Sequence, residues 1–153
     1  MVNRSDIDLV LEANRYLVLG TAAEDGRPWV TPLFFALLDA DRVCWVSSPD
    51  SRHSRNIIHR AAVAITVFDS GVGVGRAEAA FFDADAARVT PAETNAALLA
   101  LNSRLNQDKQ LSDDDLQPRG PLLVYQATMR HRYLLVRGGN PDFGNAVDMT
   151  VEV

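Results

Sequence analysis

Short apolar segments of strand length, separated by turns, follow one another along most of this 153-residue chain. The turn Glu24-Asp25-Gly26 contains Asp-Gly, which supplies the positive φ angles that tight hairpins require. Short strands with hairpin-length joins favour an antiparallel barrel over a doubly wound sheet. The pattern therefore predicts a mainly β fold with minor α structure. The expected strands are 16–22, 29–38, 42–48, 63–68, 72–82, 122–128, 132–136 and 146–153.

Three helices are expected between these strands. Ser5-Asp6 caps a first helix that runs to about Asn14, and residues 51–60 form a short second one. Thr90-Pro91-Ala92-Glu93 predicts the capping box of a third helix, with proline at its first position. The polar segment 106–120 is expected to be a solvated loop, because its aspartates lack the alternating spacing of a calcium loop.

A proline inside an apolar strand is the most unusual local feature. The segment 29–38 is apolar on both alternating faces, as in a barrel wall. Pro32 has no N–H to donate, so the strand must bulge or lose a neighbour at this point. We therefore expect something other than a strand beside Thr31 and Pro32. Glycines at 71, 73 and 75 further predict that the strand 72–82 is strongly bent.

Size and charge narrow the class of protein. The length predicts a single domain over residues 1–153. A net charge of −5 argues against nucleic-acid partners and against docking on an anionic membrane. The N-terminus lacks an apolar signal core, and no segment resembles a membrane span, so a cytoplasmic protein is expected. The single cysteine, Cys44, excludes a disulfide or a Cys-rich metal cluster; it is expected to be buried, and no metal is expected.

Positive charge concentrates in the helix expected over 51–60. This segment holds Arg52, Arg55 and Arg60 and no acidic residue, in a chain of net charge −5. A helix N-terminus carries about half a positive charge, so cations in its first turn are unfavourable unless an anion binds there. Free N–H groups, serine hydroxyls and a guanidinium fork suit a phosphate. The alternative is that these arginines form an ordinary solvated surface.

Three segments of the chain, which follow one another in the same order as in the family, resemble the pyridoxamine 5′-phosphate oxidase-like superfamily of FMN-binding split barrels. They are 19–35 (LGTAAEDGRPWVTPLFF), 43–56 (VCWVSSPDSRHSRN), and 62–68 followed by 75–78. Together they cover roughly residues 16–80, and the C-terminal strands fit more loosely. The resemblance implies a Greek-key antiparallel split β-barrel with short flanking helices. It also implies a homodimer with FMN bound at the subunit interface.

The resemblance assigns a cofactor site as well. The strand with Thr31 and Pro32 is expected beside the isoalloxazine ring, and the phosphate cradle maps onto the segment that the charge argument also selects. Family members usually have a lysine where this chain has His53, which implies phosphate binding that is either weaker or pH-dependent. The expected cofactor-binding residues are Thr31, Pro32, Val46, Ser47, Ser48, Ser51, Arg52, His53 and Asn56.

The expected function is that of an FMN-dependent oxidoreductase acting on a small molecule, in which the flavin supplies the redox chemistry. No catalytic acid or base stands out. The tryptophan and arginine that true vitamin B6 oxidases use near the C-terminus have no counterpart in 130–153, so another substrate is expected. Because the family includes members that take a deazaflavin, haem or no cofactor, two alternatives remain. One is a non-catalytic flavin-storage or sensor protein, and the other is a deazaflavin-dependent reductase.

Overall fold

The computed structural model describes residues 1–116 and 120–153, so part of the polar segment 106–120 lies outside the described residues. Three α-helices and eight strands are present there, together with three short 3₁₀ helices, two of which lie in that polar segment. The helices are α1 (Arg4–Ala13), α2 (Arg52–His59), α3 (Thr94–Asn102), η1 (Pro91–Glu93), η2 (Gln107–Lys109) and η3 (Asp113–Leu116). The strands are β1 (Tyr16–Ala22), β2 (Pro28–Phe34), β3 (Ala36–Leu37), β4 (Arg42–Ser47), β5 (Ala62–Phe68), β6 (Ala79–Arg88), β7 (Leu123–Val136) and β8 (Met149–Glu152).

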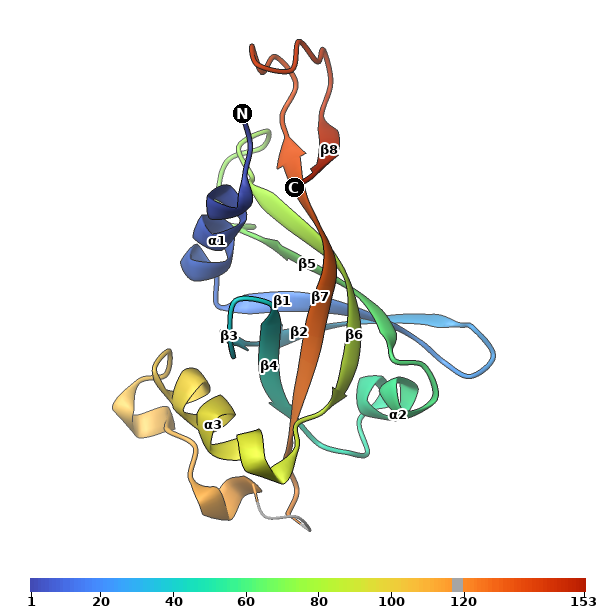
Figure 1. Ribbon diagram of the computed structural model, residues 1–153, viewed down its shortest axis with the longest axis vertical. Coiled ribbons are helices and arrows are strands. Elements are labelled where there is room, and N and C mark those ends of the chain that lie inside the picture. The colour runs from blue at the N-terminus through green and yellow to red at the C-terminus, as the bar shows by residue number, and fades with distance from the viewer. Residues whose placement is uncertain (117–119) are drawn as a thin grey trace.

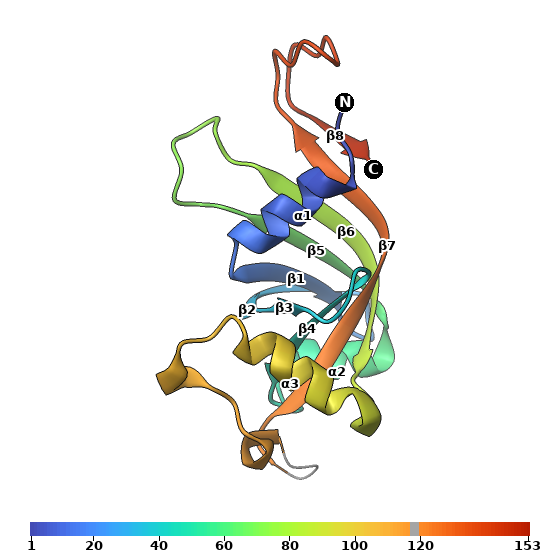
Figure 2. The same ribbon diagram turned by 60° about the vertical axis from the view of Figure 1, so that its left-hand side comes forward.

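The strands form one antiparallel sheet in the order β2-β1-β5-β6-β7-β4-β3, with β8 added beside β7. The two edge strands, β2 and β3, are neighbours in the chain with only Phe35 between them. The sheet therefore curls back on itself, as Figures 1 and 2 show, and the expected antiparallel split barrel is confirmed. Because β2 pairs with β1 alone, Pro32 lies on an edge strand, which fits its missing N–H.

β7 is one strand of 14 residues, where the sequence predicted two separate strands. Its polar middle resembles a turn in sequence, but it lies beside a register shift between Asp83 and Ala84 of β6. The strand bends there without breaking. Arg130 pairs with Asp85 (2.8 Å) and His131 with Glu152 (2.9 Å), so charged partners at the surface explain the polar run.

The glycine-rich segment was also predicted wrongly. It forms the turn between β5 and β6 rather than part of a bent strand, and β6 begins only at Ala79. Gly75 has a φ of +79°, which favours glycine. Val74 is fully exposed, so it cannot belong to a barrel wall.

Two helix starts differ from the predicted ones. Asn3, not Ser5, caps α1, and its capping box is closed by Asp6. Before α3, Glu93 does not cap the backbone. Its carboxylate instead pairs with Arg42 at 2.8 Å, and the chain makes the 3₁₀ turn η1 first.

Two apolar clusters hold the fold together. Inside the barrel, alternate strand residues such as Leu19 and Trp45 are fully buried, and α1 and α2 add apolar side chains at different parts of the curled sheet (Figure 1). The second cluster lies between β4 and α3 and contains Cys44 and Leu101. Burial raises the pKa of the Cys44 thiol to about 12, so this cysteine is a small buried hydrophobe, as expected.

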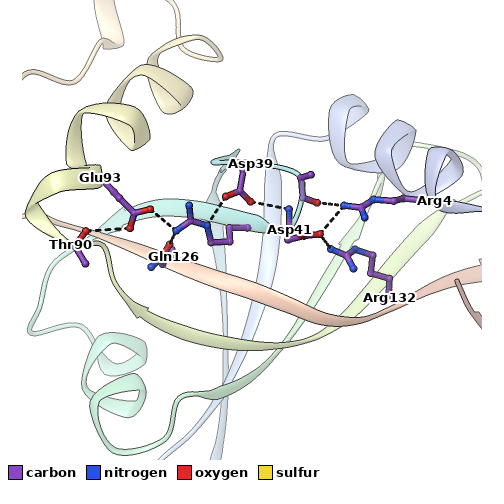
Figure 3. Close-up of polar contacts among 9 residues, drawn as sticks. Arg4, Asp39, Asp41, Thr90, Glu93, Gln126 and Arg132 are labelled. Carbon is purple, nitrogen blue, oxygen red and sulfur yellow. Dashed lines mark hydrogen bonds and ion pairs between the residues drawn. The ribbon is translucent and has the colours of Figure 1, made fainter.

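A polar network anchors the turn between β3 and β4 (Figure 3). Arg42 donates to Asp39 (2.7 Å), Glu93 (2.8 Å) and Gln126 (2.8 Å). In the same turn, Asp41 accepts hydrogen bonds from one arginine of α1 and one of β7, Arg4 and Arg132. The turn is thereby joined to α1, β7 and η1.

None of the helices within residues 1–116 and 120–153 combines the length and apolar character needed to cross a bilayer.

Candidate functional site

The sequence-predicted residues gather around the corner between β4 and α2. Ser47 ends β4, and a short connection leads to Ser51, whose side chain caps α2. This is the short helix expected over residues 51–60. α2 packs against β1 and β2, so its first turn lies next to the edge strand that carries Thr31.

His53 joins the two serines of this corner. Its Nε2 lies 2.7 Å from Oγ of Ser47 and 3.1 Å from Oγ of Ser51. Ser47 and His53 are buried, and burial lowers the pKa of His53 because desolvation disfavours the imidazolium. Two hydroxyls and one imidazole therefore converge in a partly desolvated place, and the hydroxyl of Ser51 also donates to Oγ of Ser54 (2.8 Å).

The lowered pKa of His53 makes stability depend on pH. Neutral His53 contributes stability that is present above its unfolded pKa, near 6.5, and is lost as the pH falls toward the lower folded value. We expect the free energy of unfolding, measured by urea titration, to decrease on acidification below about pH 6.5.

The matched variants are His53→Gln and His59→Gln, because His59 is exposed on the same helix. His53→Gln should flatten part of this pH dependence, whereas His59→Gln should leave it unchanged. Equal pH profiles for wild type and His53→Gln would contradict the assignment.

The three arginines of α2 have different surroundings. Arg55 donates to the carbonyl of Asp50 (2.7 Å), and Arg60 donates to the carbonyl of Ala23 (3.1 Å). Backbone carbonyls therefore hold these two arginines, neither of which was among the expected cofactor-binding residues. Arg52 instead stacks on Trp29, with Cζ 4.3 Å from the ring centroid.

A second polar contact lies further inside the barrel. Asn56 donates to Oγ1 of Thr21 (2.9 Å), and both residues are buried. Thr31 lies opposite Leu19 in the β1–β2 pair, so it shares the inner face of the sheet with Thr21. Its Oγ1 is buried and has no hydrogen-bond partner in the part of the chain that the structure describes.

Three predicted residues are placed differently. Val46 packs in the cluster toward α3, on the face of β4 opposite to Ser47. Pro32 is exposed on the outer face of β2. Ser48 accepts a hydrogen bond from the backbone N–H of Asp50 (3.2 Å) and so supports the connection to α2. The structure thus brings together Ser47, Ser51 and His53, whereas Arg52 contacts Trp29, and Asn56 contacts Thr21.

A sequence model of the family described as pyridoxamine 5′-phosphate oxidase matches residues 5–131. This chain belongs to the pyridoxamine 5′-phosphate oxidase family. The match contains the whole α2 corner and ends within β7. No curated protein sequence matches the chain.

Solved structures share the fold of this pyridoxamine 5′-phosphate oxidase family member. HutZ, the heme storage protein from Vibrio cholerae, is 18% identical over 85% of this chain and 92% of its own, with a TM-score of 0.68. A FAD-binding protein from Mesorhizobium loti is 20% identical over 86% and 92%, with a TM-score of 0.63. An F420 reductase is 23% identical over 82% and 94%, with a TM-score of 0.61.

Two residues at the corner of this family member were not among the predicted site residues. Thr21 lies within the segment 19–35 but carries no local signal, because its partner Asn56 is distant in sequence. Trp29 follows the first hairpin and could equally have been a core residue. Its partial exposure and its contact with Arg52 follow from the packing of α2 on β2.

Cavities are found elsewhere in this family member. One of about 450 Å³ lies between α1 and the segment after β7, and its lining includes Val10, Leu134 and Phe143. No residue of α2 lines it. Within the described residues, no group of three or more His, Cys, Asp or Glu side chains gathers to hold a metal ion.

Proposed function

We propose that this chain is a cytoplasmic FMN-dependent oxidoreductase that acts on a small molecule as a homodimer. The observation that carries the proposal is the polar corner at the start of α2. There the hydroxyls of Ser47 and Ser51 meet His53, beside an Arg52 guanidinium with uncommitted N–H donors. This set matches the needs of a phosphate monoester, which accepts several hydrogen bonds and carries negative charge.

The edge strand β2, which lies beside this corner, provides evidence for a flavin ring at the other end of the ligand. A buried hydroxyl without a partner costs about 1–3 kcal/mol, and Thr31 has such a hydroxyl on the inner face of β2. The polar edge of a flavin ring would satisfy it. Because β2 is an edge strand, one side of it is free of a neighbouring strand.

In this proposal the chain holds and orients the cofactor. When bound, FMN supplies the transfer of electrons or hydride to the substrate. Arg52, Ser47 and Ser51 would hold the phosphate, and His53, whose Nε2 contacts both serine hydroxyls, would orient them. β2 lies along the ring and keeps water from one side of it.

A second copy of the chain is needed to complete the site in this proposal. The outer face of β2, β1, β5 and β6 is mainly apolar, with Thr66 and Asp83 also on it. A hollow of about 240 Å³ lies on this face, lined by residues such as Val30, Ala64 and Phe81. Val30 is 65% exposed in the single chain, although it belongs to a strand. Contiguous exposed apolar residues of this kind mark association surfaces, and closed pairs are the commonest oligomers.

Val30→Asp is expected to convert the homodimer to a monomer, because a carboxylate would be buried without a partner at the centre of this face. Light scattering should give twice the chain mass of 16.8 kDa for wild type and the single mass for the variant. Val74→Asp is the matched control, since Val74 is fully exposed in the β5–β6 turn. A monomeric wild type, or an unchanged mass for Val30→Asp, would contradict this interface.

The function is tested by the absorbance of the purified protein and by titration with FMN. Flavin bands that remain after gel filtration, or saturable FMN binding, would support the proposal. Bleaching of bound FMN by reduced nicotinamide would favour an oxidoreductase over a storage or sensor protein. Binding of a deazaflavin or haem in preference to FMN would contradict the cofactor; an F420 reductase and a heme storage protein are among the proteins that share this fold.

A further inference from the structure

Trp29 lies under the guanidinium group of Arg52 and connects two elements of the site. Trp29 belongs to the edge strand β2, and Arg52 is the first residue of α2. In the β1–β2 pair Trp29 lies opposite Thr21, so its side chain is on the inner face, against which α2 packs. The distance of 4.3 Å between Cζ and the ring centroid is that of a cation–π contact.

This contact leaves the donors of Arg52 available. Stacking uses the flat face of the guanidinium, whereas its five N–H groups lie in the plane and point outward. No acceptor within residues 1–116 and 120–153 forms a hydrogen bond with these groups. By contrast, Arg55 on the same helix donates to one backbone carbonyl, and Arg60 just after the helix donates to two.

We propose that Trp29 is the positioning residue that orients Arg52 toward the phosphate of the bound cofactor. The inference rests on the proposed function, because it assigns Trp29 to the same site. A free arginine in the first turn of a helix samples many rotamers, and restricting them on binding reduces affinity. Trp29 restricts them beforehand, so that a phosphate meets a bidentate donor already in place.

The two tryptophans of the chain allow a test that needs no cofactor. Trp29 is 41% exposed and Trp45 is 0% exposed, so acrylamide quenches mainly the emission of Trp29. Inorganic phosphate is expected to change this quenchable emission in wild type, compared with potassium chloride at equal ionic strength. The change should be absent in Arg52→Ala.

The second measurement compares FMN with riboflavin, which lacks the phosphate. Trp29→Ala is expected to weaken FMN binding about three- to thirtyfold, the range of a cation–π contact, and to leave riboflavin binding unchanged. Trp29→Phe should keep most of the FMN affinity, because it keeps an aromatic face. In an Arg52→Ala background, Trp29→Ala should cause no further loss.

Equal weakening of FMN and riboflavin by Trp29→Ala would mean that Trp29 contacts the ring, and would overturn the proposal. A full effect of Trp29→Ala in the Arg52→Ala background would also overturn it. A wild-type protein that binds neither flavin contradicts the proposed function. In that case the phosphate experiment alone tests the role of Trp29. A quenchable emission that does not respond to phosphate overturns that role.

Discussion

Arg52→Ala is expected to weaken FMN binding by about 1–3 kcal/mol, the range for a charge-assisted contact. The arginine has no competing hydrogen bond in the described chain, so its donors are available to a ligand. Titration of the variant with FMN, followed by flavin fluorescence, measures the change. Arg52→Lys should recover only part of the loss, because an ammonium group cannot form the bidentate pair.

Arg55→Ala is the matched control for this prediction. Arg55 lies on the same helix with the same charge, but its guanidinium is held by the carbonyl of Asp50. Its removal should leave FMN affinity close to that of wild type. An Arg52→Ala protein that binds FMN as tightly as Arg55→Ala would remove Arg52 from the site.

Arg104→Ala is expected to lower the free energy of unfolding by about 3 kcal/mol. Arg104 follows α3 and donates to the carbonyl of Phe35 (3.2 Å) and to the carbonyl of Asn14 at the end of α1. Its Cζ also lies 4.8 Å from the centroid of the Phe35 ring. Without Arg104, partly buried carbonyls at the end of α1 and between β2 and β3 lose their hydrogen-bond partner. No other positive charge replaces it within α1, because the last turn of α1 contains no basic residue.

Urea unfolding followed by circular dichroism measures this loss, which also corresponds to a decrease of roughly 6–12 °C in Tm for a chain of this size. Arg104→Lys should recover less than half, because one ammonium cannot span both groups of carbonyls. Arg27→Ala removes an exposed arginine from the first hairpin and should change stability by less than about 0.5 kcal/mol. An Arg104→Ala protein as stable as Arg27→Ala would show that these carbonyls find other partners.

The sequence correctly predicted those helices and strands whose formation depends on residues close together in the chain. Apolar runs of strand length identified β1 and β4, and the helix expected over residues 51–60 corresponds to α2. The segment from Ser47 to Asn56 could be selected as a site because its serines, histidine and arginines are adjacent in the chain. By contrast, β7 was divided because its exposed polar middle resembles a turn, and only its pairing with β6 and β8 keeps it continuous.

The sequence by itself determined the apolar pattern of most strands, the interruption of strand pairing that Pro32 requires, and the short positively charged helix over residues 51–60. Only the tertiary structure decided which of those charges is available. Backbone carbonyls hold Arg55 and Arg60, whereas Arg52 rests on Trp29 and keeps its donors free. The physical reason is the separation along the chain of the residues that interact. Strand alternation and capping act between residues a few positions apart, whereas stacking and side-chain hydrogen bonds depend on which distant segments the curled sheet brings into contact.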